Sequence, residues 1–280
     1  MRMKKRIITI GGSDSLSGGG IQADLATFTE YGFQGLSALT SIVTADSADF
    51  HIHPLATNLL KEQLATMATL DGLAAVKTGL LVSPEQVTMV AHFLKTVILP
   101  LGLPIVIDPV MVFKEAGAPT LSPLGRTLSE ALFPLATVVT PNLVEASQLT
   151  WDQITDEAGL IAAAKKIQVS GPKAVVVKGG QRLAGRQAVD VLVTTDEVNV
   201  MYQPQVNTPF NNGAGCTFSA AIASQLALKQ SVFTAVTDAK QFVHAAIQSG
   251  LPLDQQQTLG MVWQSARRLG GQHEETNAKD

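Results

Sequence analysis

Short apolar runs rich in β-branched residues alternate along the chain with longer segments whose apolar positions recur at helical spacing. The short runs predict strands, and the longer segments predict helices that each bury one apolar face. This alternation is typical of βαβ units and of a mostly parallel sheet. The expected strands are 6–10, 37–43, 74–77, 105–107, 137–139 and 174–177. The expected helices between them are 21–31, 58–70, 84–99, 122–132 and 157–169.

The pattern changes after Gly180. Segments 188–194 and 198–202 are strand-like and flank the polar residues 195–197, which predicts a hairpin. Two long helical segments, 215–228 and 232–249, follow. Because no repeat, linker or composition shift marks a boundary, we expect one domain over residues 1–270 and a polar tail over 271–280. The predicted fold class is α/β, with a doubly wound, mostly parallel central sheet flanked by helices.

Composition narrows the classes of function. Of the 280 residues, 46% are apolar and 15% are charged, and the formal net charge is -3. Such a chain favours a well-packed core over disorder and has no overall attraction for nucleic acid. Every apolar run ends before the roughly 18 residues that a membrane helix needs, so we expect no membrane association. The single cysteine, Cys216, cannot form an internal disulfide, which favours a cytoplasmic location.

Polar and glycine-rich residues follow the expected strands. In a doubly wound sheet, ligands bind at the carboxyl ends of the strands, so chemistry is expected there. One of these groups alone would be ordinary turn chemistry, but all of them together favour a binding site. The groups are 11–14, 77–79, 108–109, 140–142 with Glu145, 178–180 and 211–216.

The segment Gly213-Ala214-Gly215-Cys216 leads into an expected helix. Small residues let the backbone approach a ligand closely, and the amino end of a helix attracts anions. The glycine spacing of this segment does not fit a Walker A loop. The segment is not a dinucleotide-binding fingerprint either, because that motif would follow the first strand. The segment therefore predicts a phosphate or oxyanion pocket.

Cys216 lies at the amino end of this helix, where the helix dipole is expected to lower the pKa of a thiol. That position makes Cys216 a candidate base or nucleophile. The alternative is that Cys216 is a small buried side chain without a chemical role.

Asp108, Asn142 and Glu145 follow neighbouring strands and carry the oxygen ligands that Mg²⁺ prefers. The alternative interpretations are a turn at Asp108 and a solvated helix face at Glu145. His51 and His53 lie in the segment 48–54, which is expected to be a loop, and in an extended stretch they would share one face. Two histidines without a third ligand predict no metal site.

Together these motifs resemble the ribokinase-like kinases, and within them the branch of hydroxymethylpyrimidine and pyridoxine/pyridoxal kinases. The resemblance covers residues 7–253. In that branch a cysteine replaces the aspartate base of the sugar kinases. The motifs that carry the resemblance are Gly12-Ser13-Asp14-Ser15 with 18–25, then 107–112, 140–146 and 213–220.

The resemblance implies a ribokinase-like fold and ATP-dependent phosphorylation of the 5'-hydroxymethyl group of a vitamin B6 vitamer. It implies ATP and Mg²⁺ as cofactors and a homodimer, and it leaves a monovalent-cation requirement open. By the same resemblance, Cys216 acts as the base, Gly213, Ala214 and Gly215 form the anion hole, and Lys114 comes from a lid. The acceptor ring would lie near Ser13, Gly19, Ala45, His51, Leu80 and Val110. The nucleotide would lie near Asn142, Lys178, Gly179, Gly180, Val189, Gly213 and Lys240, and the metal near Asp108 and Glu145.

Departures from the motifs separate the members of this branch. Pyrimidine kinases usually carry a glutamine where this chain has Ala45, whereas Lys114 and the surroundings of Lys240 resemble pyridoxal kinases of Gram-positive bacteria. Those kinases have a second cysteine where this chain has Phe113. The main alternative is a hydroxymethylpyrimidine or hydroxymethylpyrimidine phosphate kinase. Two others are a nucleotide-binding module without catalysis and a thiol hydrolase. The hydrolase would need a histidine base, for which the sequence offers no clear candidate, because His244 is on an expected long helix and is expected to pack there.

Overall fold

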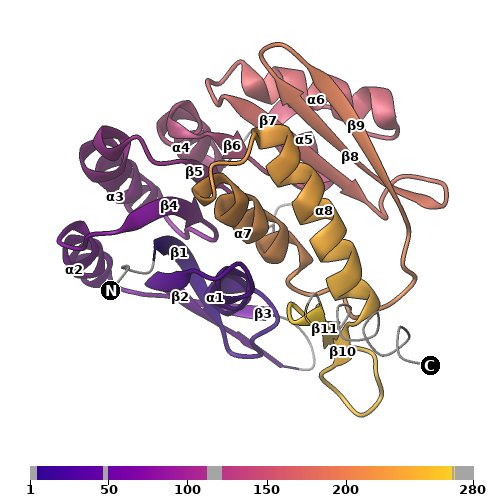
Figure 1. The fold of residues 1–280 in the computed structure, drawn as a ribbon, viewed down its shortest axis with the longest axis horizontal. Helices are drawn as coiled ribbons and strands as arrows, with labels where there is room; N and C mark the ends of the chain where they lie inside the picture. Colours follow the sequence, from indigo (N-terminus) through magenta and orange to yellow (C-terminus); the bar gives the residue numbers. More distant parts are fainter. Residues whose placement is uncertain (1–4, 47–49, 112–121, 267, 269–280) are drawn as a thin grey trace, which may run out of the picture.

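A single mixed sheet forms the centre of the computed structural model, which describes residues 5–46, 50–111, 122–266 and 268 (Figure 1). Within these residues the strand order is β3-β2-β1-β4-β5-β6-β7-β8-β9. The parallel strands are β1 (Arg6–Asp14), β2 (Gln34–Ala45), β4 (Leu73–Thr78), β5 (Ile105–Ile107), β6 (Val138–Val139) and β7 (Ala174–Gly180). The antiparallel strands are β3 (Phe50–Pro54), β8 (Gln187–Thr194) and β9 (Val198–Pro204). The expected α/β fold class is confirmed.

Helices cover both faces of the sheet, and each layer buries its own apolar core. One layer consists of α2 (Thr57–Ala68), α3 (Pro84–Phe93), α4 (Pro123–Ala131), α5 (Leu143–Thr150) and α6 (Glu157–Gln168). The other consists of α1 (Gly20–Glu30), α7 (Ala214–Ala227) and α8 (Val232–Gln248), which pack against one another in Figure 1.

Strand β1 shows how the pattern of side chains assigns the two faces. Ile8 and Ile10 join the core under α2 and α3, whereas Ile7 joins the core under α1 and α7. Successive residues of a strand point to opposite faces, so Thr9 points toward α1, where it contacts Asp24. Thr9 is therefore a fully buried polar residue on the face of the sheet that α1 covers.

Strands β1, β2 and β7 are longer than expected, and in β1 and β7 glycines continue the pairing instead of starting a turn. Strand β1 runs through Asp14 rather than ending at Ile10, and its pairing with β2 continues past an irregularity between Gly11 and Gly12. Strand β7 likewise continues through Gly180.

Two further expectations were wrong. Residues 50–54 were expected as a loop, but they form the edge strand β3, antiparallel to β2. The helix expected over 84–99 is an α-helix only to Phe93, and Leu94–Ile98 continues as a π-turn. Pro100 lacks a backbone N–H and cannot extend the regular α-helical bonding here.

The chain after α8 adds a small antiparallel pair, β10 (Leu251–Pro252) with β11 (Gly260–Met261). The other helices lie within two residues of the expected bounds, except α5, which had no expected range of its own. A search of the described residues finds no helix with the length and hydrophobicity to cross a membrane.

Candidate active site

Two cavities open where the parallel strands end, and they meet at the start of α7. The larger has a volume of about 600 Å³ and lies beside β8 and α8. The smaller, of about 390 Å³, lies at the ends of β1 and β4, with apolar walls from Val43, Phe50, Ile52, Leu80 and Val110. Both cavities are lined by Asn142, Lys178 and Gly215. A ligand in one cavity can therefore approach a ligand in the other at the amino end of α7.

Gly213 allows the sharp entry into α7. Its φ of 84° is in the left-handed region, and a Cβ there would lie 1.7 Å from the carbonyl oxygen of Gly18. No described side chain caps α7. The Ala214 amide donates to the Asn211 carbonyl at 3.2 Å, which leaves the amides of Gly215 and Cys216 for a ligand. Of the predicted anion-hole residues, Gly213 lines the smaller cavity, Ala214 lines the larger, and Gly215 lines both.

The glycine-rich loop after β1 packs against the turn at Gly213 that begins α7. The carboxylate of Asp14 accepts hydrogen bonds from the amides of Leu16 at 2.9 Å and Gly19 at 2.8 Å. The amide of Gly20 in turn donates to the thiol of Cys216. The glycine-rich loop is thereby packed directly against the predicted oxyanion pocket.

Cys216 does not have the low pKa expected from its position on the helix. The half-buried side chain lines the smaller cavity. Burial raises its pKa to about 11, although the charge of Lys77 acts in the opposite direction. Desolvation of a thiolate therefore outweighs the helix dipole, and at neutral pH the group is a thiol.

Asp108 lies between β5, β7 and α7. Its carboxylate accepts hydrogen bonds from Lys178 Nζ at 3.0 Å, Thr140 Oγ1 at 3.0 Å and Ser219 Oγ at 3.1 Å. Burial acts to lower the pKa of Lys178, but the carboxylates of Asp108 and Glu145 raise it above its usual range. Lys178 is therefore a cation at the junction of the two cavities.

Asn142 and Glu145 form a capping box at the start of α5. Asn142 Oδ1 accepts from the amides of Val144 at 2.9 Å and Glu145 at 3.0 Å, and Glu145 Oε2 accepts from the amide of Asn142 at 2.8 Å. The amide oxygen of Asn142 is thus engaged, and its NH₂ group is the part suited to a phosphate. Glu145 is only 5% exposed, so it does not lie on a solvated helix face.

The carboxylates of Asp108 and Glu145 line the same cavity, and both already accept hydrogen bonds from the protein. Among the described residues no group of three or more His, Cys, Asp or Glu could hold a metal ion. Mg²⁺ commonly binds through one or two carboxylates together with water and phosphate oxygens. The pair therefore fits an ion that arrives with phosphates, which it would help neutralise.

Four of the seven predicted nucleotide residues line the larger cavity, whereas Gly179, Val189 and Gly213 do not. Lys178, Gly180 and Lys240 are in its wall. Lys240 Nζ is held by Asp190 Oδ2 at 2.7 Å and by the carbonyl of Ala188 at 3.0 Å. The backbone of Gly179 packs against the Val189 carbonyl, and the Val189 side chain is in the core. Because side chains alternate along β8, Ala188 and Asp190 face the cavity instead.

The predicted acceptor residues divide in a similar way. Gly19, Leu80 and Val110 line the smaller cavity, whereas Ser13, Ala45 and His51 do not. The hydroxyl of Ser13 accepts from Gln22 Nε2 at 2.8 Å, and His51 pairs with Asp46 at 2.7 Å on the exposed side of β3. Phe50 and Ile52, on the opposite face of β3, are the cavity residues that the sequence prediction missed. Lys114 lies outside the described residues.

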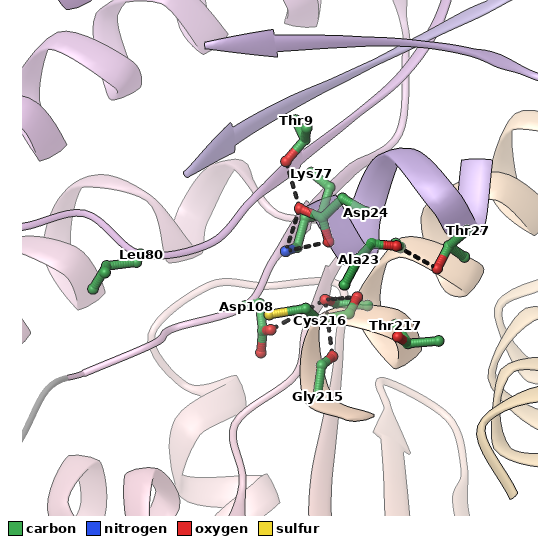
Figure 2. Close-up of polar contacts among 12 residues, drawn as sticks. Thr9, Ala23, Asp24, Thr27, Lys77, Leu80, Asp108, Gly215, Cys216 and Thr217 are labelled. Atoms are coloured by element: carbon green, nitrogen blue, oxygen red, sulfur yellow. Dashed lines mark hydrogen bonds and ion pairs between the residues drawn. The ribbon is translucent and has the colours of Figure 1, made fainter. Parts of the chain in front are cut away.

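Asp24 and Lys77 are also cavity residues without a predicted role. They form a buried ion pair next to α7, shown with Thr9 and Cys216 in Figure 2. A lysine in an otherwise apolar strand is the sequence signal that could have identified the pair. His244, the base that a thiol hydrolase would need, lines the larger cavity, whereas Cys216 lines the smaller one.

Burial of Glu145 gives a testable pH dependence. Burial raises its pKa to about 7, with Asp108 adding to the effect and Lys178 opposing it. Because the pKa of Glu145 is raised in the folded state, the free energy of unfolding is highest at low pH, where Glu145 is protonated. It falls as the pH rises toward and through 7, where the buried carboxylate ionises. Glu145→Gln can keep the capping contact without ionising, so at pH 8 it should be more stable than the wild type by up to roughly 3 kcal/mol.

Urea unfolding at pH 5 and pH 8 checks this expectation. The exposed Glu62 in α2 provides the matched control, because Glu62→Gln should change stability equally little at both values. If the difference in unfolding free energy between Glu145→Gln and the wild type did not grow from pH 5 to pH 8, the raised pKa of Glu145 would be contradicted.

Known proteins with a similar sequence or structure are kinases. The sequence pattern of the phosphomethylpyrimidine kinase family matches residues 14–261. The chain is 42% identical to the pyridoxine kinase of Bacillus subtilis over 271 residues, which cover 95% of this chain and 98% of that protein. It is 39% identical to the hydroxymethylpyrimidine/phosphomethylpyrimidine kinase of Haemophilus influenzae over 256 residues, 90% of this chain and 94% of that protein. The structure of the pyridoxal kinase from Staphylococcus aureus in complex with AMP-PCP and pyridoxal matches with a TM-score of 0.87 and 33% identity, over 95% of both chains.

Proposed function

The chain belongs to the phosphomethylpyrimidine kinase family, and from that premise we propose that it is an ATP-dependent kinase of vitamin B6. It transfers a phosphoryl group to the 5'-hydroxymethyl group of pyridoxal, pyridoxine or pyridoxamine. The observation that carries this function is the meeting of the two cavities at the amino end of α7, where Asn142, Lys178 and Gly215 line both. The named relatives, a pyridoxine kinase and a pyridoxal kinase that binds an ATP analogue, support it.

Each cavity has a role in this reaction. The larger cavity would hold ATP, with its phosphates directed toward Lys178 and the first amides of α7. The smaller cavity would hold the pyridine ring between its apolar walls. The acceptor oxygen then bonds to the γ-phosphorus, the bond from that phosphorus to ADP breaks, and the hydroxyl proton passes to the thiolate form of Cys216, which becomes a thiol.

The charge of the transferring group is balanced by this chain's own residues. Lys178 supplies a cation at the junction, and the amides that follow Gly213 supply donors without side chains. Mg²⁺, which Asp108 and Glu145 would hold together with phosphate oxygens and water, would supply further neutralisation of the phosphates. Closure of the site by Lys114 stays a prediction.

Hydroxymethylpyrimidine phosphorylation is the second candidate, because the Haemophilus influenzae relative is nearly as similar as the pyridoxine kinase. The two candidates share the fold and the cavities. They differ in the polar contacts that the acceptor ring requires.

We expect kcat/KM for pyridoxal or pyridoxine to exceed that for hydroxymethylpyrimidine by at least about tenfold. Ala45 is two residues from the cavity residue Val43 on β2, so both side chains are on the same face of the strand. At this position alanine offers no amide to the polar edge of a pyrimidine. ADP release with a panel of both substrate types measures the ratio.

Ala45→Gln is the matched variant, since it adds the missing amide and should shift the ratio toward the pyrimidine. A wild-type preference for the pyrimidine would overturn the vitamin B6 assignment. Binding of ATP and vitamer without turnover would instead identify a non-catalytic module.

The remaining expectations stay proposals: a single kinase domain over residues 1–270, a homodimer and a cytoplasmic location. The cytoplasmic proposal is supported by the lone cysteine, since disulfides are not needed. The tail 271–280 lies outside the described residues.

A further inference from the structure

A buried ion pair forms one wall of the smaller cavity beside Cys216. Lys77 Nζ lies 2.9 Å from Asp24 Oδ1 and 2.8 Å from Asp24 Oδ2, and Thr9 Oγ1 donates to Asp24 Oδ2 at 2.6 Å. Both charged side chains are 1% exposed. Asp24, Lys77 and Cys216 all line the same cavity, and Figure 2 shows Thr9, Asp24 and Lys77 grouped on one side of the cysteine.

Stability alone does not account for this pair. Removing two charges from water is costly, and apolar side chains of similar size often stabilise a protein equally well or better. The pair joins α1 to β4, which are already packed on a continuous apolar core. A cation fixed at the wall of a reaction cavity is therefore better explained by what it does to the contents of that cavity.

Four charged groups surround the thiol. Cys216 faces Lys77 from β4, Asp24 from α1, Asp108 after β5 and Lys178 at the end of β7. Lys178 is already bound to Asp108 at 3.0 Å. Of the groups that act on Cys216, Lys77 is the strongest that favours the thiolate, and Asp24 weakens its influence.

We propose that Lys77 is a positioning residue for phosphoryl transfer, held by Asp24 and Thr9 so that its positive charge stabilises the thiolate of Cys216. Lys77 itself gains and loses no bond or proton. It acts on the step in which Cys216 takes the hydroxyl proton, because a buried thiol ionises poorly without a nearby cation. This inference rests on the proposed function and adds a residue to it.

The lone cysteine permits a test that does not depend on kinase activity. Iodoacetamide is neutral and iodoacetate is an anion, and both alkylate a thiolate. The ratio of their rates, iodoacetate over iodoacetamide, cancels the thiolate fraction and reports the electrostatic potential at Cys216. No other cysteine in the chain contributes.

Two variants separate the charge of Lys77 from that of its partner. Asp24→Asn removes the negative charge and should raise the ratio by roughly fivefold, the effect of one charge at short range in a partly polar medium. Asp24→Asn with Lys77→Gln removes both charges but keeps two amides that can pair, and the ratio should fall back to the wild-type value or below. Thr9→Val is the matched control, because it disturbs the same cluster without removing a charge and should leave the ratio within about twofold.

Loosened packing gives a different result, since it admits both reagents equally and leaves the ratio unchanged. An unchanged ratio in Asp24→Asn therefore overturns the proposal even if the double variant does not fold. A ratio that stays high in a folded double variant also overturns it, because the potential would then not come from Lys77.

Kinase assays separate this inference from the function on which it rests. In the double variant kcat should fall about tenfold while KM for ATP stays unchanged, because Lys77 does not line the larger cavity. An active wild type whose variants keep the same ratio overturns the role of Lys77 alone. A wild type without kinase activity overturns the proposed function, whatever the ratios are.

Discussion

Replacing Cys216 by alanine should lower kcat by about 10²–10⁴-fold and leave KM for ATP nearly unchanged. The thiolate form of Cys216 is the proposed proton acceptor in the smaller cavity, and Cys216 is not part of the larger cavity. Since burial raises its pKa to about 11, the wild-type kcat should also rise with pH between 6 and 9 as the thiolate population grows. Steady-state rates over this pH range measure both effects.

The pH dependence of Cys216→Ala and the rate of Cys216→Asp test whether Cys216 acts as a base. Cys216→Ala should remove the rise of kcat with pH, whereas Cys216→Asp should recover part of the lost rate, because it installs the carboxylate base of the related sugar kinases. If Cys216→Ala kept more than about half of the wild-type kcat, the base assignment would be abandoned, and the amides of α7 alone would be credited.

Gly213→Ala should reduce kcat by at least about 10²-fold, the scale of losing an anion-hole donor. The new Cβ would lie 1.7 Å from the Gly18 carbonyl oxygen, so the glycine-rich loop and the start of α7 cannot both keep their places. The same variant should also lose stability, which urea unfolding measures alongside the rate.

Gly102→Ala is the matched control, because Gly102 also has a left-handed φ, of 64°, but has open space around its Cβ position. It should cost about 1 kcal/mol of backbone strain and leave kcat unchanged. Equal kcat values for the two variants would show that the close approach at Gly213 has no part in the reaction.

Much of the fold could be predicted because it depends on local patterns. The alternation of short β-branched runs and amphipathic segments predicted the parallel strands and the helices, most of them within a few residues. The edge strand β3 was missed because only one of its faces is apolar and mostly polar residues precede it, which is also typical of a loop. Strand β1 was predicted too short because glycine is compatible with both a turn and a paired strand.

The sequence could predict which segments contain candidate site residues, but it could not predict toward which face of the sheet each side chain points. Leu80, Val110 and Lys178 line the cavities as expected. His51 and Val189 point away from them, and their strand neighbours point in. A shift of one residue along a strand moves a side chain to the other face of the sheet, and a motif does not specify which face meets the ligand.

The sequence by itself determined the α/β architecture, the strand ends as the place where the cavities open and the small residues at the start of α7, because these depend on periodicity and on residue type. Only the tertiary structure decided the environment of each group. Asp24 and Lys77 are 53 residues apart in the chain and meet only after α1 packs on β1, the neighbour of β4 in the sheet. Tertiary packing likewise removes water from Cys216 beside α1 and from Glu145 on α5, and this burial raises the pKa of both. Desolvation and charge pairing depend on distance in space, which no local pattern in the sequence contains.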